Sequence, residues 1–133
     1  MKDLIDEFLA QKIFAVAGSF RNEEKVAYKI LKDLKARGYI VYPVNPQSKE
    51  VDGQKCYPSV MDIPGPVDVL DLVTPSSATE QIVKQCRAKG ITRVWIQPGA
   101  ESETAIKYCN DNNIKVVYNA CVMRDGSKDA DTK

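Results

Sequence analysis

Residues 13–46 read IFAVAGSFRNEEKVAYKILKDLKARGYIVYPVNP, and this stretch decides the fold. The apolar run Ile13 to Ala17 is short and uncharged, as expected of a strand buried on both faces, and it stops at Gly18-Ser19. A charged segment with a helical apolar face follows, and a second apolar run, Tyr39 to Tyr42, ends in Pro43-Val44-Asn45-Pro46. The residues at helical spacing are Val26, Ala27, Ile30, Leu31 and Leu34. This order predicts a βαβ unit, whose right-handed crossover makes the two strands parallel.

The turn at Gly18 is a candidate phosphate site. It lies at the carboxyl end of the first strand, where backbone N–H groups and the helix dipole favour an anion. Any such turn favours a glycine, and only the Gly18 position of the dinucleotide fingerprint G-x-G-x-x-G is recognisable here. We expect Glu23 and Glu24 in the first turn of the helix, where they would compete with a phosphate. Arg21 and Lys25 would offset them.

Composition indicates one globular domain. The chain has 133 residues, of which 44% are hydrophobic and 28% charged, as in ordinary globular proteins. The net charge of +1 gives no general attraction to nucleic acid or an anionic membrane. No apolar run approaches the roughly 20 residues of a membrane span, and residues 1–12 lack the apolar core of a signal peptide.

Cysteine and histidine usage narrows the chemistry. The cysteines, which are far apart and form no C-x-x-C pair, are Cys56, Cys86, Cys109 and Cys121. With no export signal, this favours reduced thiols and a cytoplasmic location over disulfides. The sequence has no histidine, which excludes Ser/His and Cys/His triads and any histidine-containing metal site. Nothing in the cysteine spacing indicates a metal, so we expect none.

The rest of the chain alternates helices and strands. The expected helices cover residues 2–11, a segment opened by a capping box of Ser77 and Glu80 and closed by Gly90, and residues 103–112. The expected third, fourth and fifth strands are Val67 to Val73, Arg93 to Ile96 and Lys115 to Tyr118. After Pro46 we expect a long loop with at most one short helix, near residues 59–63. Residues 1–123 then form the domain, and 124–133 a disordered polar tail.

This alternation predicts an α/β protein: a single Rossmann-like domain with a five-stranded parallel sheet, order 3-2-1-4-5, and helices on both faces. Ligands of such sheets bind outside the carboxyl ends of the strands, here at a switch point between the first and fourth strands. The segments arriving there are Gly18-Ser19, Pro43 to Pro46, Val73-Thr74-Pro75 and Gln97-Pro98-Gly99. Their prolines leave carbonyls and small apolar faces exposed, which suits an adenine better than acid–base catalysis.

The second strand argues against NAD. An NAD site requires an acidic residue at the end of this strand, but Tyr42-Pro43-Val44-Asn45 stands there, and Glu50 and Asp52 lie in the following loop. Lys49, just past Pro46, could join Arg21 and Lys25 around a ligand that carries several phosphates. Taken one by one, each of these residues is more simply a solvated surface charge.

Four elements carry a family resemblance: A-V-A-G-S, G-Y-x-V-Y-P-V-N-P, D-V-L-D-L-V-T-P and V-W-I-Q-P-G. Over about residues 3–123 the chain resembles the small stand-alone CoA-binding proteins of bacteria and archaea. Those are similar to the amino-terminal CoA-binding domain of the succinyl-CoA synthetase alpha subunit. The synthetase's catalytic histidine belongs to a second domain, and this chain has no histidine to replace it.

The resemblance implies a set of CoA contacts. Gly18, Ser19 and Phe20 would meet the phosphates, with Arg21 and Lys25 assisting. Val44, Asn45 and Pro46 would lie along the nucleotide, with Lys49 as the basic residue after the N-P step. Val73, Thr74 and Pro75 match the third-strand contact. Gln97 and Gly99 would face the crevice from the other side.

We therefore expect a protein that binds CoA or an acyl-CoA and has no catalysis of its own. The alternatives are a nicotinamide-dependent oxidoreductase and a detached CoA-binding subunit of a larger acyl-CoA enzyme. No nucleic-acid or membrane partner is expected, whereas a homo-oligomer or an acyl-CoA enzyme as partner stays open. Cys121 follows the fifth strand on the crevice side, so a mixed disulfide with CoA is a further hypothesis; a small buried thiol is the simpler interpretation.

Overall fold

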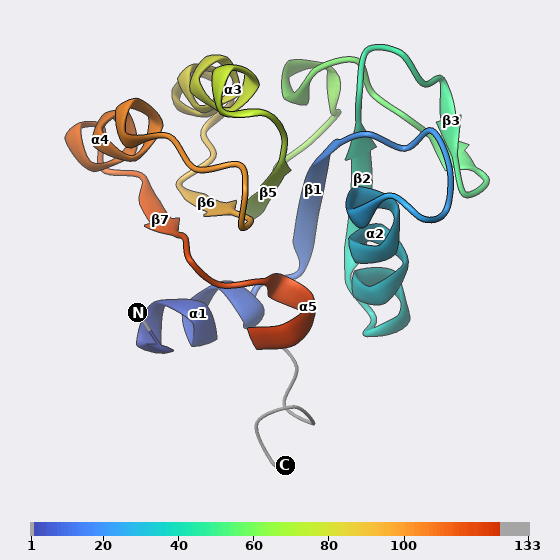
Figure 1. Ribbon diagram of the computed structural model, residues 1–133, viewed down its shortest axis with the longest axis horizontal. Coiled ribbons are helices and arrows are strands. Elements are labelled where there is room, and N and C mark those ends of the chain that lie inside the picture. Colours follow the sequence, from blue (N-terminus) through green and yellow to red (C-terminus); the bar gives the residue numbers. More distant parts are fainter. Residues whose placement is uncertain (1, 126–133) are drawn as a thin grey trace.

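The computed structural model describes residues 2–125, which form a parallel sheet between two layers of helices (Figure 1). The sheet contains five strands: β1 (Ile13–Gly18), β2 (Ile40–Val44), β5 (Val69–Val73), β6 (Arg93–Ile96) and β7 (Lys115–Val117). The helices are α1 (Lys2–Leu9), α2 (Val26–Ala36), α3 (Ser76–Lys89), α4 (Glu103–Asp111), α5 (Val122–Asp125) and the 3₁₀ turn η1 (Val60–Asp62). The predicted α/β class and Rossmann-like architecture are confirmed. Within residues 2–125, no helix is long and apolar enough to cross a membrane.

The strand order shows which segment fills each place of the Rossmann pattern. The sheet runs β2-β1-β5-β6-β7, so residues 67–73, counted as the third strand above, pair with β1 and not with β2. The third place, beside β2, is held by one parallel bridge between Val44 and Tyr57. If this bridge is counted as the third strand in chain order, β5 becomes the fourth strand and β6 the fifth. The order then reads 3-2-1-4-5, with β7 as a sixth strand. The bridge is not extended, because residues 45–48 leave β2 in a turn closed by Ser48 N and Asn45 O (3.5 Å).

Each face of the sheet has its own hydrophobic core. In β1, Phe14 and Val16 belong to one cluster and Ala15 and Ala17 to the other, because successive side chains of a strand point to opposite faces. Helices α1, α2 and α5 contribute to the first cluster, and α3, α4 and η1 to the second. Figure 1 shows these two helical layers on either side of the strands.

The approach of α2 to β1 explains Gly18. A Cβ atom at Gly18 would lie 2.7 Å from Ala27 Cβ and 2.8 Å from the Val73 carbonyl oxygen, so only glycine fits where helix and strands meet. The helix begins at Val26, and residues 19–25 form a loop. The expectation that Glu23 and Glu24 occupy the first turn is therefore wrong. They precede the helix, because the chain needs this loop to pass from the sheet edge to its face.

Helix α3 does not begin with the predicted capping box. Its N-cap is Pro75, and no side chain of the cap residue bonds to the helix, so the Ser77–Glu80 capping box does not form. The Glu80 carboxylate instead accepts a hydrogen bond from Ser102 Oγ, which links α3 to the start of α4. Gly90 closes α3 in the left-handed conformation (φ 82°), as predicted.

The loop after β2 contains a hairpin that the sequence analysis did not predict. Strands β3 (Glu50–Val51) and β4 (Gln54–Lys55) are antiparallel and joined by Asp52 and Gly53, both at positive φ. Asp-Gly is a strong signal for such a two-residue turn. At the other end of the chain, residues 124 and 125 complete α5, and the rest of the expected tail lies outside the described residues.

Candidate nucleotide-binding site

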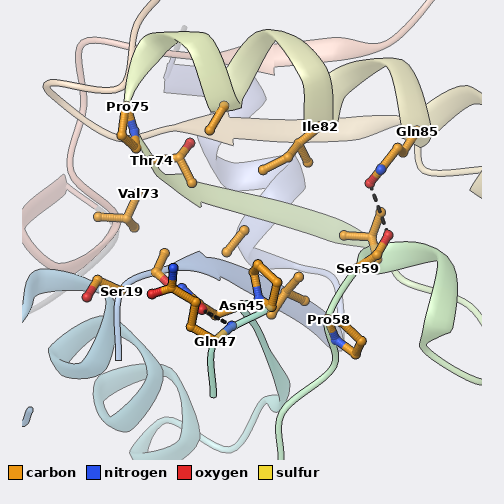
Figure 2. A pocket seen from close by; sticks show the side chains of 16 residues that line it. Ser19, Asn45, Gln47, Pro58, Ser59, Val73, Thr74, Pro75, Ile82 and Gln85 are labelled. Atoms are coloured by element: carbon orange, nitrogen blue, oxygen red, sulfur yellow. Dashed lines mark hydrogen bonds between the residues drawn. The ribbon is translucent and has the colours of Figure 1, made fainter. Parts of the chain in front are cut away.

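A cavity of about 540 Å³ opens at the carboxyl ends of β1, β2 and β5, beneath α3 (Figure 2). This is a switch point, where the chain leaves β1 and β5 towards opposite faces of the sheet. It was predicted between the first and fourth expected strands, but the neighbour of β1 is β5, the third expected strand, and not β6. The lining residues are Ala17, Gly18, Ser19, Val44, Asn45, Pro46, Gln47, Pro58, Ser59, Val60, Val73, Thr74, Pro75, Ala78, Ile82 and Gln85. Most of them are apolar or small, so a ligand would meet carbonyls, a few hydroxyls and amides, and flat apolar walls.

Asn45 holds the floor of this cavity together. Its Nδ2 donates to the Gly18 carbonyl at 2.6 Å, and its Oδ1 accepts from Gln47 N at 2.7 Å. Its backbone N–H donates to Tyr57 O at 2.9 Å. The amide therefore ties the end of β1 to the end of β2 and to the bridge beside it, and both of its polar atoms are already bonded within the protein.

Three hydrogen bonds fix the opposite wall. Thr74 Oγ1 and the buried Thr79 Oγ1 lie 2.7 Å apart, which sets the turn between β5 and α3. Ser59 Oγ donates to Gln85 Oε1 at 3.2 Å and joins the η1 segment to α3 at one end of the cavity. Lys89 Nζ donates to the Ile63 carbonyl, which anchors the same segment to α3 a second time.

A second cavity of about 610 Å³ adjoins the first and shares Pro46 and Pro58 with it. Its remaining lining residues are Ser48, Lys49, Lys55, Cys56, Tyr57 and Asp62. Two lysines face it, and Lys55 Nζ also lies 5.2 Å from the centroid of the Tyr57 ring. The two cavities together offer an apolar space with a positively charged neighbour, which suits a nucleotide with several phosphates.

The structure gathers most of the predicted contact residues. Those that line the first cavity are Gly18, Ser19, Val44, Asn45, Pro46, Val73, Thr74 and Pro75, and Lys49 lines the second. Those that line neither are Phe20, Arg21, Lys25, Gln97 and Gly99. Phe20 is buried under α2 against Tyr28, and Arg21 is exposed on the β1–α2 loop. The complete set of CoA contacts stays a prediction.

Gln97 has a structural role on the other face of the sheet. Its Nε2 donates to Asp71 Oδ1 at 2.5 Å, and its Oε1 accepts from Val122 N at 3.1 Å. It therefore connects β5 to α5 and is 1% exposed. Burial raises the pKa of Asp71 from 3.8 to about 7, against the hydrogen bond from Gln97 and the charge of Arg37. Gly99 is exposed, and its N–H donates to Glu101 Oε1 at 2.7 Å.

Sequence reasoning missed Ala17 and Gln47, which are next to predicted contacts, and the cavity residues that come from the η1 segment and α3: Pro58, Ser59, Val60, Ala78, Ile82 and Gln85. For three of these residues the sequence contained a usable signal. Ala78, Ile82 and Gln85 are spaced four and three residues apart, so they share one face of the helix that follows a crevice-facing strand end. The η1 segment gave no such signal, because its place beside α3 depends on contacts with residues far along the chain.

Metal ligands and cysteine thiols are the remaining candidates for chemistry near the cavities. Within residues 2–125, no three His, Cys, Asp or Glu side chains lie close enough to hold a metal ion. Burial raises the pKa of Cys56, which lines the second cavity, so its thiol stays protonated near neutral pH. Cys121 is half-buried and lines neither cavity, and its mixed disulfide with CoA remains a hypothesis.

Comparison with known proteins agrees with this geometry. The family model described as CoA binding domain matches residues 12–127. The chain is 34% identical over 106 residues to an ADP-forming acetate–CoA ligase of Methanocaldococcus jannaschii, covering 80% of this chain and 15% of the ligase. It is 37% identical over 102 residues to the alpha subunit of ADP-forming acetate–CoA ligase II of Pyrococcus furiosus, covering 76% of this chain and 22% of the subunit. A solved structure of a hypothetical protein from Pyrococcus horikoshii OT3 superposes with a TM-score of 0.90 at 38% identity, covering 94% of this chain and 89% of that one.

The fold and these matches place the chain in the CoA-binding class of Rossmann-like domains. The chain belongs to the CoA-binding domain family, and the resemblance given by the V-Y-P-V-N-P and W-I-Q-P-G motifs is confirmed. The ligases that it matches are much longer, since it spans only 15% and 22% of the length of the two named above.

Proposed function

We propose that this protein binds CoA or an acyl-CoA through the nucleotide end, in the cavity at the carboxyl edge of the sheet. One observation carries the proposal: the A-G-S, V-N-P and V-T-P segments, far apart in sequence, meet around this cavity. The apolar faces of Pro46 and Ile82 suit an adenine ring, and Lys49 and Lys55 supply charge for phosphates next to it.

Thermal unfolding with CoA, dephospho-CoA, ADP and NAD at equal concentrations tests this. A ligand at about 100 times its dissociation constant stabilises the folded state by about 2.7 kcal/mol, which raises the midpoint by several degrees. We expect CoA to raise it and NAD to leave it unchanged. Stabilisation by NAD alone would favour the oxidoreductase alternative and overturn the proposal.

A matched pair of variants places the ligand. Ala78 lines the cavity, whereas Ala88 is exposed on the same helix and lines neither cavity. Ala78→Phe should abolish the shift with CoA by filling the space, while Ala88→Phe should keep it. Equal shifts in both variants would place CoA elsewhere.

We further propose that the protein performs no acyl-CoA chemistry by itself. The chain contains no histidine, and no nucleophile–base pair faces the cavity among the described residues. Incubation with ATP, acetate and CoA should therefore release no ADP above a blank. ADP formation by the purified chain would overturn this point.

The chain also suits the role of a detached CoA-binding subunit, because it matches only a part of each ligase. In that case a larger partner supplies the catalytic residues. Size-exclusion chromatography of the host extract should then show this chain eluting with a larger protein, and ADP release should appear in that fraction alone. Elution of all of the chain at its own mass would exclude a stable subunit.

A further inference from the structure

We propose that Gln85, oriented by Ser59, reads the edge of the adenine base in the cavity and makes the site specific for adenine. This inference rests on the proposed function and names a specificity-determining residue for it. Neither residue was among the contacts expected from the sequence, and both line the first cavity.

The orientation of the Gln85 amide follows from its partner. Ser59 Oγ accepts a hydrogen bond from Met61 N at 3.1 Å and donates its own proton to Gln85 at 3.2 Å. The atom of Gln85 that receives this proton is Oε1, which leaves Nε2 as a directed donor. Within residues 2–125, Nε2 has no hydrogen-bond partner. The Gln85 amide therefore offers a ligand one donor, Nε2, and one acceptor, the second lone pair of Oε1, and the places of these two groups are fixed.

At the end of the cavity next to Ser59, the Gln85 amide is a polar group placed to meet the edge of a base, whereas the Gln47 side chain lies beside Asn45 (Figure 2). Ile82 and Ala78, one and two turns before Gln85, are apolar, and Pro46 belongs to the strand-end side of the cavity. The Asn45 amide is already bonded to Gly18 and Gln47. A flat ring between apolar walls would therefore find Gln85 at its rim.

The position of Gln85 also fits the direction of a nucleotide. In Figure 2, Gln85 and Ser59 lie at one end of the cavity and Ser19 at the other. A base at Gln85 would direct the phosphates towards Ser19 and the backbone N–H groups at the end of β1, where an anion is favoured.

Adenine matches the fixed order of the amide. Its amino group donates to Oε1, and ring nitrogen N1 beside it accepts from Nε2. Glutamine uses the same order of acceptor and donor on the amino group and N7 of adenine in DNA. Hypoxanthine presents a carbonyl and a protonated ring nitrogen in the reverse order, so it would require a flipped amide and loss of the bond from Ser59. We expect CoA to bind at least about tenfold more tightly than its hypoxanthine analogue.

The test is calorimetric titration of CoA, hypoxanthine-CoA, ADP and IDP into wild type, Gln85→Glu, Ser59→Ala and Gln81→Glu. Glutamate keeps the shape of Gln85 but cannot donate to adenine, and it accepts readily from the protonated nitrogen of hypoxanthine. Gln85→Glu should therefore lose the adenine preference, and Ser59→Ala should reduce it. Gln81 is exposed on α3 and lines neither cavity, so Gln81→Glu adds the same charge and should keep the preference.

The outcomes separate this inference from the proposed function. An equal preference ratio in wild type and Gln85→Glu, with CoA bound, overturns the inference and leaves the function standing. Binding of ADP over IDP that depends on Gln85, without CoA binding, overturns the function and supports the inference. Absence of binding for all four ligands overturns both.

Discussion

Asp71→Asn should make this protein more stable at neutral and alkaline pH. Asp71 lies in the middle of β5 with no exposed surface. Its Oδ1 accepts from Gln97, while Oδ2 is buried without a hydrogen-bond partner in the described chain. Burial disfavours the charged form, which is why the pKa of this carboxyl rises from 3.8 to about 7.

The sign follows from proton binding. Between pH 3.8 and about 7 the folded state keeps the proton on Asp71 and the unfolded chain releases it. The free energy of unfolding therefore falls as pH rises through this window, at up to about 1.4 kcal/mol per pH unit. A shift of about three pH units corresponds to a total of about 4 kcal/mol. Asparagine has a similar shape but does not ionise. The free energy of unfolding of Asp71→Asn should therefore not fall with pH in this window.

Urea unfolding of both proteins at pH 4.5, 6, 7 and 8 measures the effect. The difference in unfolding free energy should be small at pH 4.5 and grow to a few kcal/mol at pH 8, about 1–2 M in the urea midpoint. Asp6→Asn, on the exposed side of α1, is the control and should show no such growth. Parallel curves for wild type and Asp71→Asn from pH 4.5 to 8 would refute the reasoning.

Two further substitutions test how the site is built. Gly18→Ala should cost about 1–3 kcal/mol, because the new methyl group overlaps Ala27 and the Val73 carbonyl, and Ala27→Gly should recover part of the loss in urea unfolding. Full stability of the single variant would contradict the close approach. Asn45→Ala removes the bonds to Gly18 and Gln47, so we expect about 1–3 kcal/mol lower stability and weaker CoA binding by calorimetry. An unchanged urea midpoint would show that these two bonds do not hold the ends of β1 and β2.

The proposed site would bind a nucleotide with few charged contacts. The first cavity relies on backbone groups and apolar walls, and the lysines lie in the neighbouring cavity. Arg21 and Lys25, expected to assist at the phosphate turn, line neither space. We therefore expect Lys49 and Lys55 to contribute to CoA binding as charges beside the first cavity, whereas the backbone N–H groups at the end of β1 would meet the phosphates directed towards Ser19.

Local sequence patterns were enough to predict most of the helices and strands. Arg93 to Ile96 was predicted as a strand with the bounds that β6 has, and Gly90 closes α3 as expected. These elements are encoded by periodicity and by turn residues, which act over a few positions. The same reasoning brought Gly18-Ser19, the V-N-P segment and the V-T-P segment to one edge, because parallel strands present their carboxyl ends together.

Where the local sequence pattern led to a wrong prediction, the side chain concerned bonds to a residue far along the chain. Glu80 looked like a capping residue but bonds to Ser102, which the turn before α4 places beside it. Gln97 looked like a crevice residue because it ends a strand, yet it bonds to Asp71 and to α5. Polar side chains take the partner that packing offers, and sequence spacing does not reveal that partner.

The sequence by itself determined the class of fold, the edge of the sheet that carries the site and the family. The tertiary structure decided which side chains reach the cavity and how they are oriented. Ser59 and Gln85 are 26 residues apart, as are Asp71 and Gln97. The first pair meets because the start of η1 packs beside α3, and the second because β5 and β6 are neighbours in the sheet. Hydrogen bonding and burial depend on distances of a few ångströms, and those distances exist only once both faces of the sheet have been packed.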